Sequence, residues 1–165
     1  MTDIASDDVT SRDRHAATLP PHHDHCYVCG PHNPASTGVS FRHIDDRLVG
    51  AVTLDQRHQG VPGLAHGGAI AALLDETAGS LLIQHGLRFV TARLDVEYVA
   101  PVHIGVPLTL TAHLDKQEGR KHTVLTELRD GDTLLAVGRA LFVTVSPEHF
   151  SARGIRDDAF PAFHA

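Results

Sequence analysis

The chain has 165 residues, of which 42% are hydrophobic and 21% are charged, and its formal net charge is −6 with histidine neutral. This size suits one globular domain with its own core. The acidic balance, the absence of Trp and the lack of a basic stripe argue against nucleic acid as a partner. No apolar stretch is long enough to span a bilayer and residues 1–19 do not resemble a secretory signal, so we expect a cytoplasmic protein with no membrane partner.

Residues 1–25 are polar and lack periodicity, which predicts a disordered leader. Cys26 and Cys29 follow as a C-x-x-C pair near five histidines: His15, His22, His23, His25 and His32. One interpretation is a zinc site that uses both cysteines and a nearby histidine. The other is a flexible leader followed by two small, partly buried thiols. A second C-x-x-C is missing, so the sequence leaves both interpretations open and we assign no metal ligand.

The elements then follow in chain order. Apolar patterns predict strands over 39–44 and 48–54, on either side of the Asp45-Asp46 turn. The run 59–63 contains two glycines and a proline and predicts a loop. Residues 67–84 carry apolar side chains at i, i+3 and i+4 and on other sides as well, which predicts an enclosed helix that stops at Gly86.

Everything after this helix alternates between apolar and polar residues, as strands do. We expect strands over 90–98, 108–114, 124–128 and 134–145, with a tight hairpin at Asp130-Gly131. The tail 148–165 is weakly patterned, so we place the folded domain at 26–147. The segregated elements predict an α+β protein in which a curved antiparallel sheet wraps one long helix.

Two features of the helix indicate a catalytic site. Gly67 and Gly68 lie where it begins, and glycines there leave backbone N–H groups approachable for an oxyanion. Asp75 lies in the apolar helix, where an unpaired carboxylate costs several kcal/mol. Together they favour hydrolysis of an activated acyl group, with His66 positioning the loop before the glycines. A structural ion pair of Asp75 with an arginine is the alternative, and Glu76 is interpreted as a flanking surface or interface charge.

The spacing of these groups predicts an oligomer. Gly67 and Asp75 are eight residues apart, which is about 12 Å along a helix axis. An oxyanion donor must lie about 3 Å from the oxygen that it stabilises, so one chain cannot place both groups on one carbonyl. Two antiparallel copies of the helix can do so, and the sites then lie across a dimer interface.

Several segments resemble one family. They are QGVPGLAHGG (59–68), LLD (73–75), TARLDVEY (91–98) with Pro101-Val102, Gly119-Arg120-Lys121, Asp130-Gly131 and the CYVCG leader (26–30). Over about residues 26–145 the chain resembles the phenylacetate-pathway branch of the hotdog-fold acyl-CoA thioesterases. The resemblance implies a hotdog fold, an acyl-CoA substrate, and a homodimer or homotetramer. It implies no cofactor, since a thiolate is already a good leaving group.

The resemblance also implies roles for residues at the matching positions. The Gly67 N–H would bind the thioester oxygen, and Asp75 of the facing subunit would act as general base or nucleophile. Thr91 would hold the attacking water, and His66 would shape the oxyanion loop. Substrate contacts are expected at Gln59, Gly68, Arg120 and Lys121, the last two either on coenzyme A phosphates or in a solvated turn. A non-hydrolytic acyl-CoA or small-ligand binding protein on the same fold is the alternative function.

Overall fold

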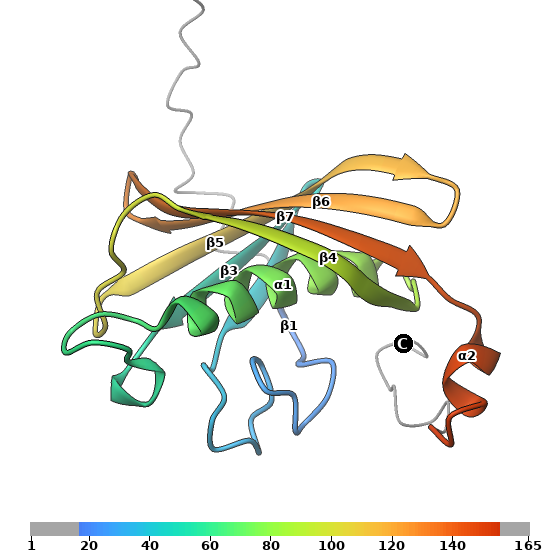
Figure 1. Cartoon of the computed structure of the whole chain (residues 1–165), viewed down its shortest axis with the longest axis horizontal. Coiled ribbons are helices and arrows are strands. Elements are labelled where there is room, and N and C mark those ends of the chain that lie inside the picture. The colour runs from blue at the N-terminus through green and yellow to red at the C-terminus, as the bar shows by residue number, and fades with distance from the viewer. Residues whose placement is uncertain (1–16, 156–165) are drawn as a thin grey trace, which may run out of the picture.

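The structure, a computed structural model, describes residues 17–155 and consists of one curved sheet around a long helix (Figure 1). All neighbouring strands are antiparallel, and their order is β1-β2-β3-β5-β6-β7-β4. The strands are β1 (Thr18–Leu19), β2 (Ser40–Ile44), β3 (Arg47–Thr53), β4 (Phe89–Tyr98), β5 (Pro107–Glu118), β6 (Lys121–Asp130) and β7 (Thr133–Thr144). The helices are the 3-10 turn η2 (Gln56–His58), α1 (Gly67–Gln84) and α2 (Pro147–Ser151).

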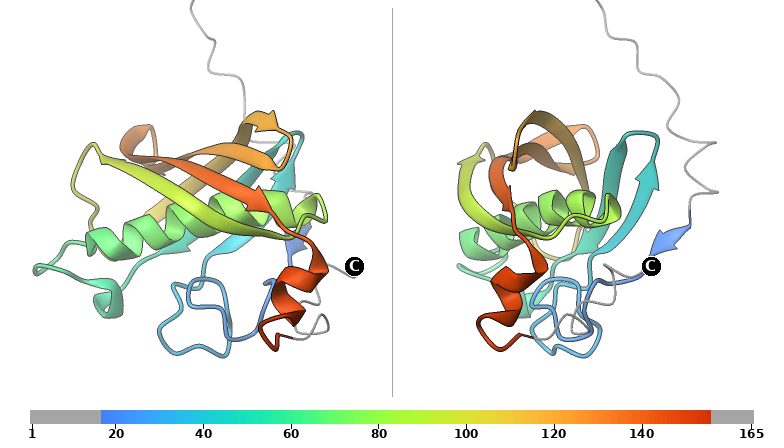
Figure 2. Two further views of the ribbon diagram at one scale, coloured as in Figure 1. Left: turned by 45° about the vertical axis from the view of Figure 1, so that its right-hand side comes forward. Right: turned by 90° about the vertical axis from the view of Figure 1, so that its right-hand side faces the viewer.

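The helix α1 lies in the hollow of the sheet, with β4 and β7 on one side and β2 and β3 on the other (Figure 2). Leu73, Leu74 and Ala78 in its middle are fully buried. Gly138 of β7 allows the sheet to approach the helix, because a Cβ there would lie 3.2 Å from Leu74 Cβ and overlap the Thr126 hydroxyl. The predicted α+β class, with one enclosed helix and a wrapping antiparallel sheet, is confirmed.

The local turn signals are confirmed as well. Gly86 follows the helix at φ +69°, and Gly131 lies in the β6–β7 hairpin at φ +53°, a backbone region that favours glycine. The β5–β6 hairpin is longer than predicted and turns at Gly119. Three short elements, β1, η2 and α2, were not predicted.

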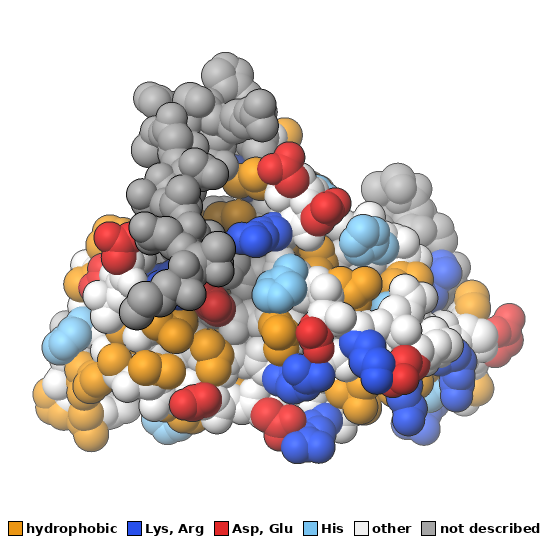
Figure 3. Space-filling view, turned by 90° about the horizontal axis from the view of Figure 1, so that it is seen from above, with side chains coloured by type: hydrophobic (Ala, Val, Ile, Leu, Met, Phe, Trp, Pro, Cys, Tyr) orange, Lys and Arg blue, Asp and Glu red, His pale blue; other side chains and the backbone are white. Residues whose placement is uncertain are grey.

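The ends of the chain lie partly outside the described residues. Of the expected leader, residues 1–16 are not described, while Thr18 and Leu19 pair with β2. Residues 156–165 of the expected tail are also outside. Within 17–155, no helix is both long and apolar enough to cross a membrane. The face of the sheet turned away from α1 mixes acidic, basic and histidine side chains with apolar ones (Figure 3).

Candidate active site

The loop before α1 is closed by His66, the residue that caps the helix. Its Nδ1 accepts a hydrogen bond of 2.9 Å from the Gly68 N–H, one of the donors that a helix start leaves without a helical partner. A Cβ on Gly68 would lie 3.0 Å from this nitrogen, so glycine lets the imidazole fold back over the helix start. His66 therefore has the geometry of the positioning residue that the sequence predicts.

Gly67 lies beside an aromatic residue at the end of β4. The Tyr98 hydroxyl donates a hydrogen bond of 2.9 Å to the Gly67 carbonyl and so fixes the first peptide of the helix. The Gly67 N–H has no hydrogen-bond partner within residues 17–155. This N–H is thus a preorganised donor that is available to an acyl oxygen. No sequence pattern predicts the Tyr98 contact, which joins residues 31 positions apart.

Asp75 lies half-buried on α1 and meets β4. Its Oδ1 accepts a hydrogen bond of 3.2 Å from the Thr91 hydroxyl, so the structure brings these two predicted residues together. The ladder between β4 and β7 is irregular between Thr91 and Arg93, and Thr91 lies at this irregularity. Burial raises the pKa of Asp75 above its ordinary value; the Thr91 hydrogen bond acts in the opposite direction, and the negative charge of Glu76 adds to the rise.

A small cavity opens at this pair. Its wall includes Asp75 and Thr91, the apolar rings of Phe89 and Phe142, and Gly79. The two rings meet edge to face with centroids 4.8 Å apart. Gly79 keeps space beside them, because a Cβ there would lie 3.3 Å from the Phe89 ring. A carboxylate, a hydroxyl and an apolar wall in one cavity suit a water and an acyl group.

The other predicted contact residues lie in two places. Gln59 closes the loop before the helix, since its Oε1 accepts a hydrogen bond of 2.7 Å from the Gly63 N–H. Arg120 and Lys121 lie at the β5–β6 turn, and Lys121 is paired in register with Val143 of β7, one residue beyond Phe142. These two cations are therefore at the Asp75 end of the sheet, whereas Gln59 is at the Gly67 end.

Two residues near the site were missed. The Glu76 side chain is only 12% exposed and contacts His22 at 3.1 Å and Cys26 Sγ at 3.5 Å. Of the two interpretations of Glu76, that of a surface charge is wrong, and that of an interface charge stays a prediction. His22 and Glu76 also line the cavity at Asp75. Helical periodicity predicts which side of the helix carries Glu76, but it does not predict which segment covers that side, so this contact could not be predicted.

Comparison with known proteins relates the chain to one family. The profile of the thioesterase superfamily matches residues 62–137, which span the helix and most of the sheet. The mouse acyl-coenzyme A thioesterase THEM4 is 34% identical over 110 residues, covering 66% of this chain and 47% of its own length. Over residues 62–137 this chain is therefore similar to the thioesterase superfamily. Like the mouse protein, the rat and bovine THEM4 proteins are matched over less than half of their length, 40% and 39%.

Solved structures confirm the hotdog fold of this chain. A thioesterase superfamily protein of known structure superimposes with a TM-score of 0.69 and 35% identity, over 74% of this chain and 63% of its own. The PaaI protein from the phenylacetic acid degradation operon of Escherichia coli gives a TM-score of 0.62 at 19% identity, over 67% and 81% of the two chains. At that identity the likeness to PaaI shows the shared fold, which is the fold that the sequence resemblance implied.

Proposed function

We propose that the protein hydrolyses the thioester of an acyl-CoA to a free acid and coenzyme A. The observation that carries the proposal is the Asp75–Thr91 pair, a half-buried carboxylate held by a hydroxyl at 3.2 Å in the wall of a cavity. Relatives with the printed name acyl-coenzyme A thioesterase, at 34% and 38% identity in mouse and cattle, support the same reaction.

The groups at the site supply each step of the reaction. Asp75 and Thr91 hold a water between them, and Asp75 accepts its proton as the oxygen attacks the acyl carbon. The Gly67 N–H donates to the oxyanion that forms, and the contacts of His66 and Tyr98 hold the following peptide, between Gly67 and Gly68, in place. The tetrahedral intermediate then expels the coenzyme A thiolate. We propose that Gln59 and Gly68 line the acyl entrance and that Arg120 and Lys121 bind the phosphates of coenzyme A.

The proposed site combines two protomers. Gly67 and Asp75 of one chain are about 12 Å apart along α1, so neither can serve the other. The sheet offers a surface for a second copy, because β4 is a ten-residue strand at its edge. Beside the start of α1, Val61, Tyr98 and Val99 expose 60%, 53% and 50% of their area. We propose a homodimer, which can pair further into a tetramer, with Gly67 of one protomer facing Asp75 of its partner.

We also propose that the protein acts in the reducing cytoplasm. The thiols of Cys26 and Cys29, which form no disulfide, fit this proposal.

Asp75 has two possible roles, and the Thr91 hydroxyl favours that of general base because it offers a second polar group to hold a water. As a nucleophile, Asp75 would instead form an acyl-enzyme anhydride. A single turnover in 18O-labelled water tests the anhydride route in which water attacks the Asp75 carbonyl carbon, since attack on the acyl carbon labels the acid in either role. A general base puts the label into the released acid in the first turnover. Label that appears first in the Asp75 carboxylate would assign the nucleophilic role.

The test of the function is a thiol-release assay with a panel of acyl-CoAs of different chain length and with aromatic acyl groups. We expect release by the wild-type protein and a loss of at least about a hundredfold in kcat for Asp75→Asn, a typical loss for a general base. Binding of acyl-CoA by the wild-type protein without release of thiol would refute hydrolysis and favour the binding-protein alternative.

A further inference from the structure

Four side chains with metal-binding atoms converge beneath α1. His22, Cys26 and Cys29 come from the loop between β1 and β2, which we call the leader loop, and Glu76 comes from the helix. One ligand atom from each lies within 4.8 Å of every other. His22 Nδ1 is 3.1 Å from Glu76 Oε1 and 3.4 Å from Cys29 Sγ. Cys26 Sγ is 3.5 Å from Glu76 Oε2.

These separations match the edges of a tetrahedral metal site. Zinc binds sulfur at about 2.3 Å and nitrogen or oxygen at about 2.0–2.2 Å, so tetrahedral edges are about 3.3–3.8 Å long. Three of the six pairs are 3.1–3.5 Å apart and lie in or just below that range. Two of the four residues, Cys29 and Glu76, are well shielded from solvent. Glu76 Oε1 lies 3.1 Å from His22 Nδ1 but accepts no hydrogen bond from the described residues. A metal ion that binds both side chains would offset the desolvation of the carboxylate.

The leader loop is built to hold the two sulfurs. The N–H groups of Val28 and Cys29 point at Cys26 Sγ at 3.3 and 3.5 Å, a turn that favours a thiolate. Gly30 N–H donates to the Cys26 carbonyl at 3.1 Å, and a Cβ on Gly30 would lie only 2.6 Å from that oxygen. The turn therefore requires the glycine that follows C-x-x-C.

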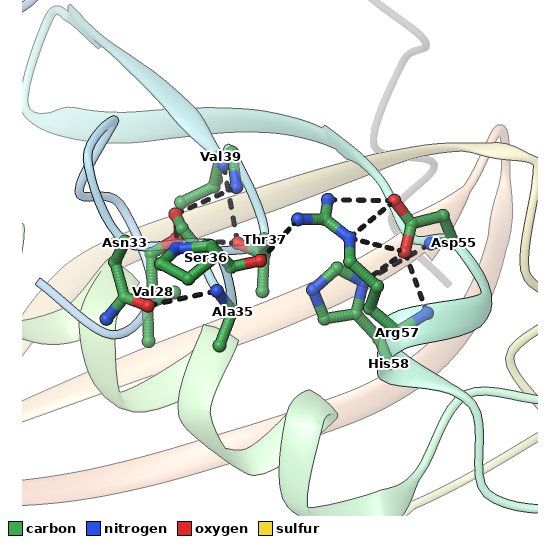
Figure 4. A network of polar contacts seen from close by, with 11 residues as sticks. Val28, Asn33, Ala35, Ser36, Thr37, Val39, Asp55, Arg57 and His58 are labelled. Carbon is green, nitrogen blue, oxygen red and sulfur yellow. Dashed lines mark hydrogen bonds and ion pairs between the residues drawn. The ribbon is translucent and has the colours of Figure 1, made fainter.

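A second layer of hydrogen bonds braces this turn (Figure 4). The hydroxyls of Ser36 and Thr37 both donate to the Val28 carbonyl at 2.8 Å, and all three residues are buried. Arg57 donates to the Pro34 carbonyl and ties the end of the loop to η2. The two cysteines thus lie on a fixed scaffold, because Val28 and Cys29 belong to the core and Cys26 packs against it.

We propose that His22, Cys26, Cys29 and Glu76 bind one divalent metal ion, and that the donor set selects zinc. Zinc binds thiolate, imidazole and carboxylate ligands, and the two thiolates disfavour hard cations such as magnesium and calcium. Four protein ligands fill a tetrahedral ion, so the site is structural and leaves no position for a substrate. The metal joins the leader loop to Glu76 of α1, the residue after Asp75. It thereby fixes His22, which lines the cavity at Asp75. The inference does not depend on hydrolysis of thioesters.

The test measures metal in the full-length protein after any affinity tag is removed. The protein is produced with zinc, dialysed, and analysed by mass spectrometry for metal per chain. We expect about one zinc per chain in the wild type and about a tenth of that or less in Cys26→Ser/Cys29→Ser. His25→Gln is the matched control, since His25 lies between the cysteines and His22 in sequence but outside the cluster. It should keep the full metal content, whereas His22→Gln should lose most of it.

Two further measurements do not depend on how the variants fold. Replacement of zinc by cobalt should give the intense charge-transfer absorption of a cobalt–thiolate bond. A chelator should lower the melting temperature of the wild type and make both thiols react with a thiol reagent. Equal zinc in the wild type and in the double cysteine variant, or a Cys26–Cys29 disulfide in place of bound metal in reduced, zinc-loaded protein, would overturn the proposal.

Discussion

Replacement of Gly67 by proline removes one N–H group and little else. Gly67 is the first residue of α1, so its N–H has no helical partner, and proline is well tolerated at that position. His66 has φ −67° and ψ 137°, the backbone region that a residue before proline prefers. We therefore expect the free energy of unfolding to change by about 1 kcal/mol or less.

The activity should respond very differently. Loss of one oxyanion donor typically lowers kcat by about 10²–10³, or about 2.7–4 kcal/mol of transition-state stabilisation. The matched control is Gly67→Ala, which adds a Cβ 3.4 Å from the Tyr98 hydroxyl, an ordinary contact, but keeps the N–H. Thiol release by both variants, with circular dichroism as a check of folding, makes the comparison. Equal activity in a folded Gly67→Pro and in Gly67→Ala would refute the role of this N–H.

Three further predictions concern the pair, the cap and the core. Asp75→Asn should lower kcat by at least about a hundredfold, and Thr91→Ala by about tenfold, because Thr91 orients the water without accepting its proton. Thiol release measures both effects, and full activity of Asp75→Asn would refute the role of Asp75 as general base. His66→Ala should cost about 1 kcal/mol of stability through the lost cap on Gly68, whereas His66→Asn should keep most of it; urea denaturation decides, and equal losses would contradict the cap. Gly138→Ala should destabilise by about 1–3 kcal/mol through overpacking, seen as a lower urea midpoint at unchanged slope, and an unchanged midpoint would contradict the close helix–sheet approach.

Local patterns explain why the main elements were predictable. The i, i+3, i+4 repeat of α1 and the alternation in β5, β6 and β7 are set by side chains close in sequence. Gly86 and Gly131 mark ends because their positive φ values favour glycine. The two-residue strand β1 has too few side chains for a period, and the irregularity at Thr91 breaks the alternation that a sequence pattern assumes.

The site was predictable only in part, because some of its contacts join neighbouring residues and others join residues far apart in the sequence. The cap of His66 on Gly68 is local, and the sequence predicts it. The Asp75–Thr91 pair joins a helix to a strand and was placed through the family resemblance. The contact of Glu76 with Cys26 spans 50 positions, and no periodicity encodes which segment covers that side of α1. The zinc interpretation stayed open for the same reason, since its fourth ligand lies far along the chain.

A mixed dimer tests the central claim most directly. Gly67→Pro and Asp75→Asn are each inactive at every site, but a dimer with one chain of each kind has one site with an intact Gly67 and an intact Asp75. With random pairing, half of the dimers are mixed and each has one good site of two, so about a quarter of wild-type activity should return. The two variants are refolded together and assayed for thiol release. Recovery to about this level supports a site shared between protomers, and no recovery in verified mixed dimers would contradict it.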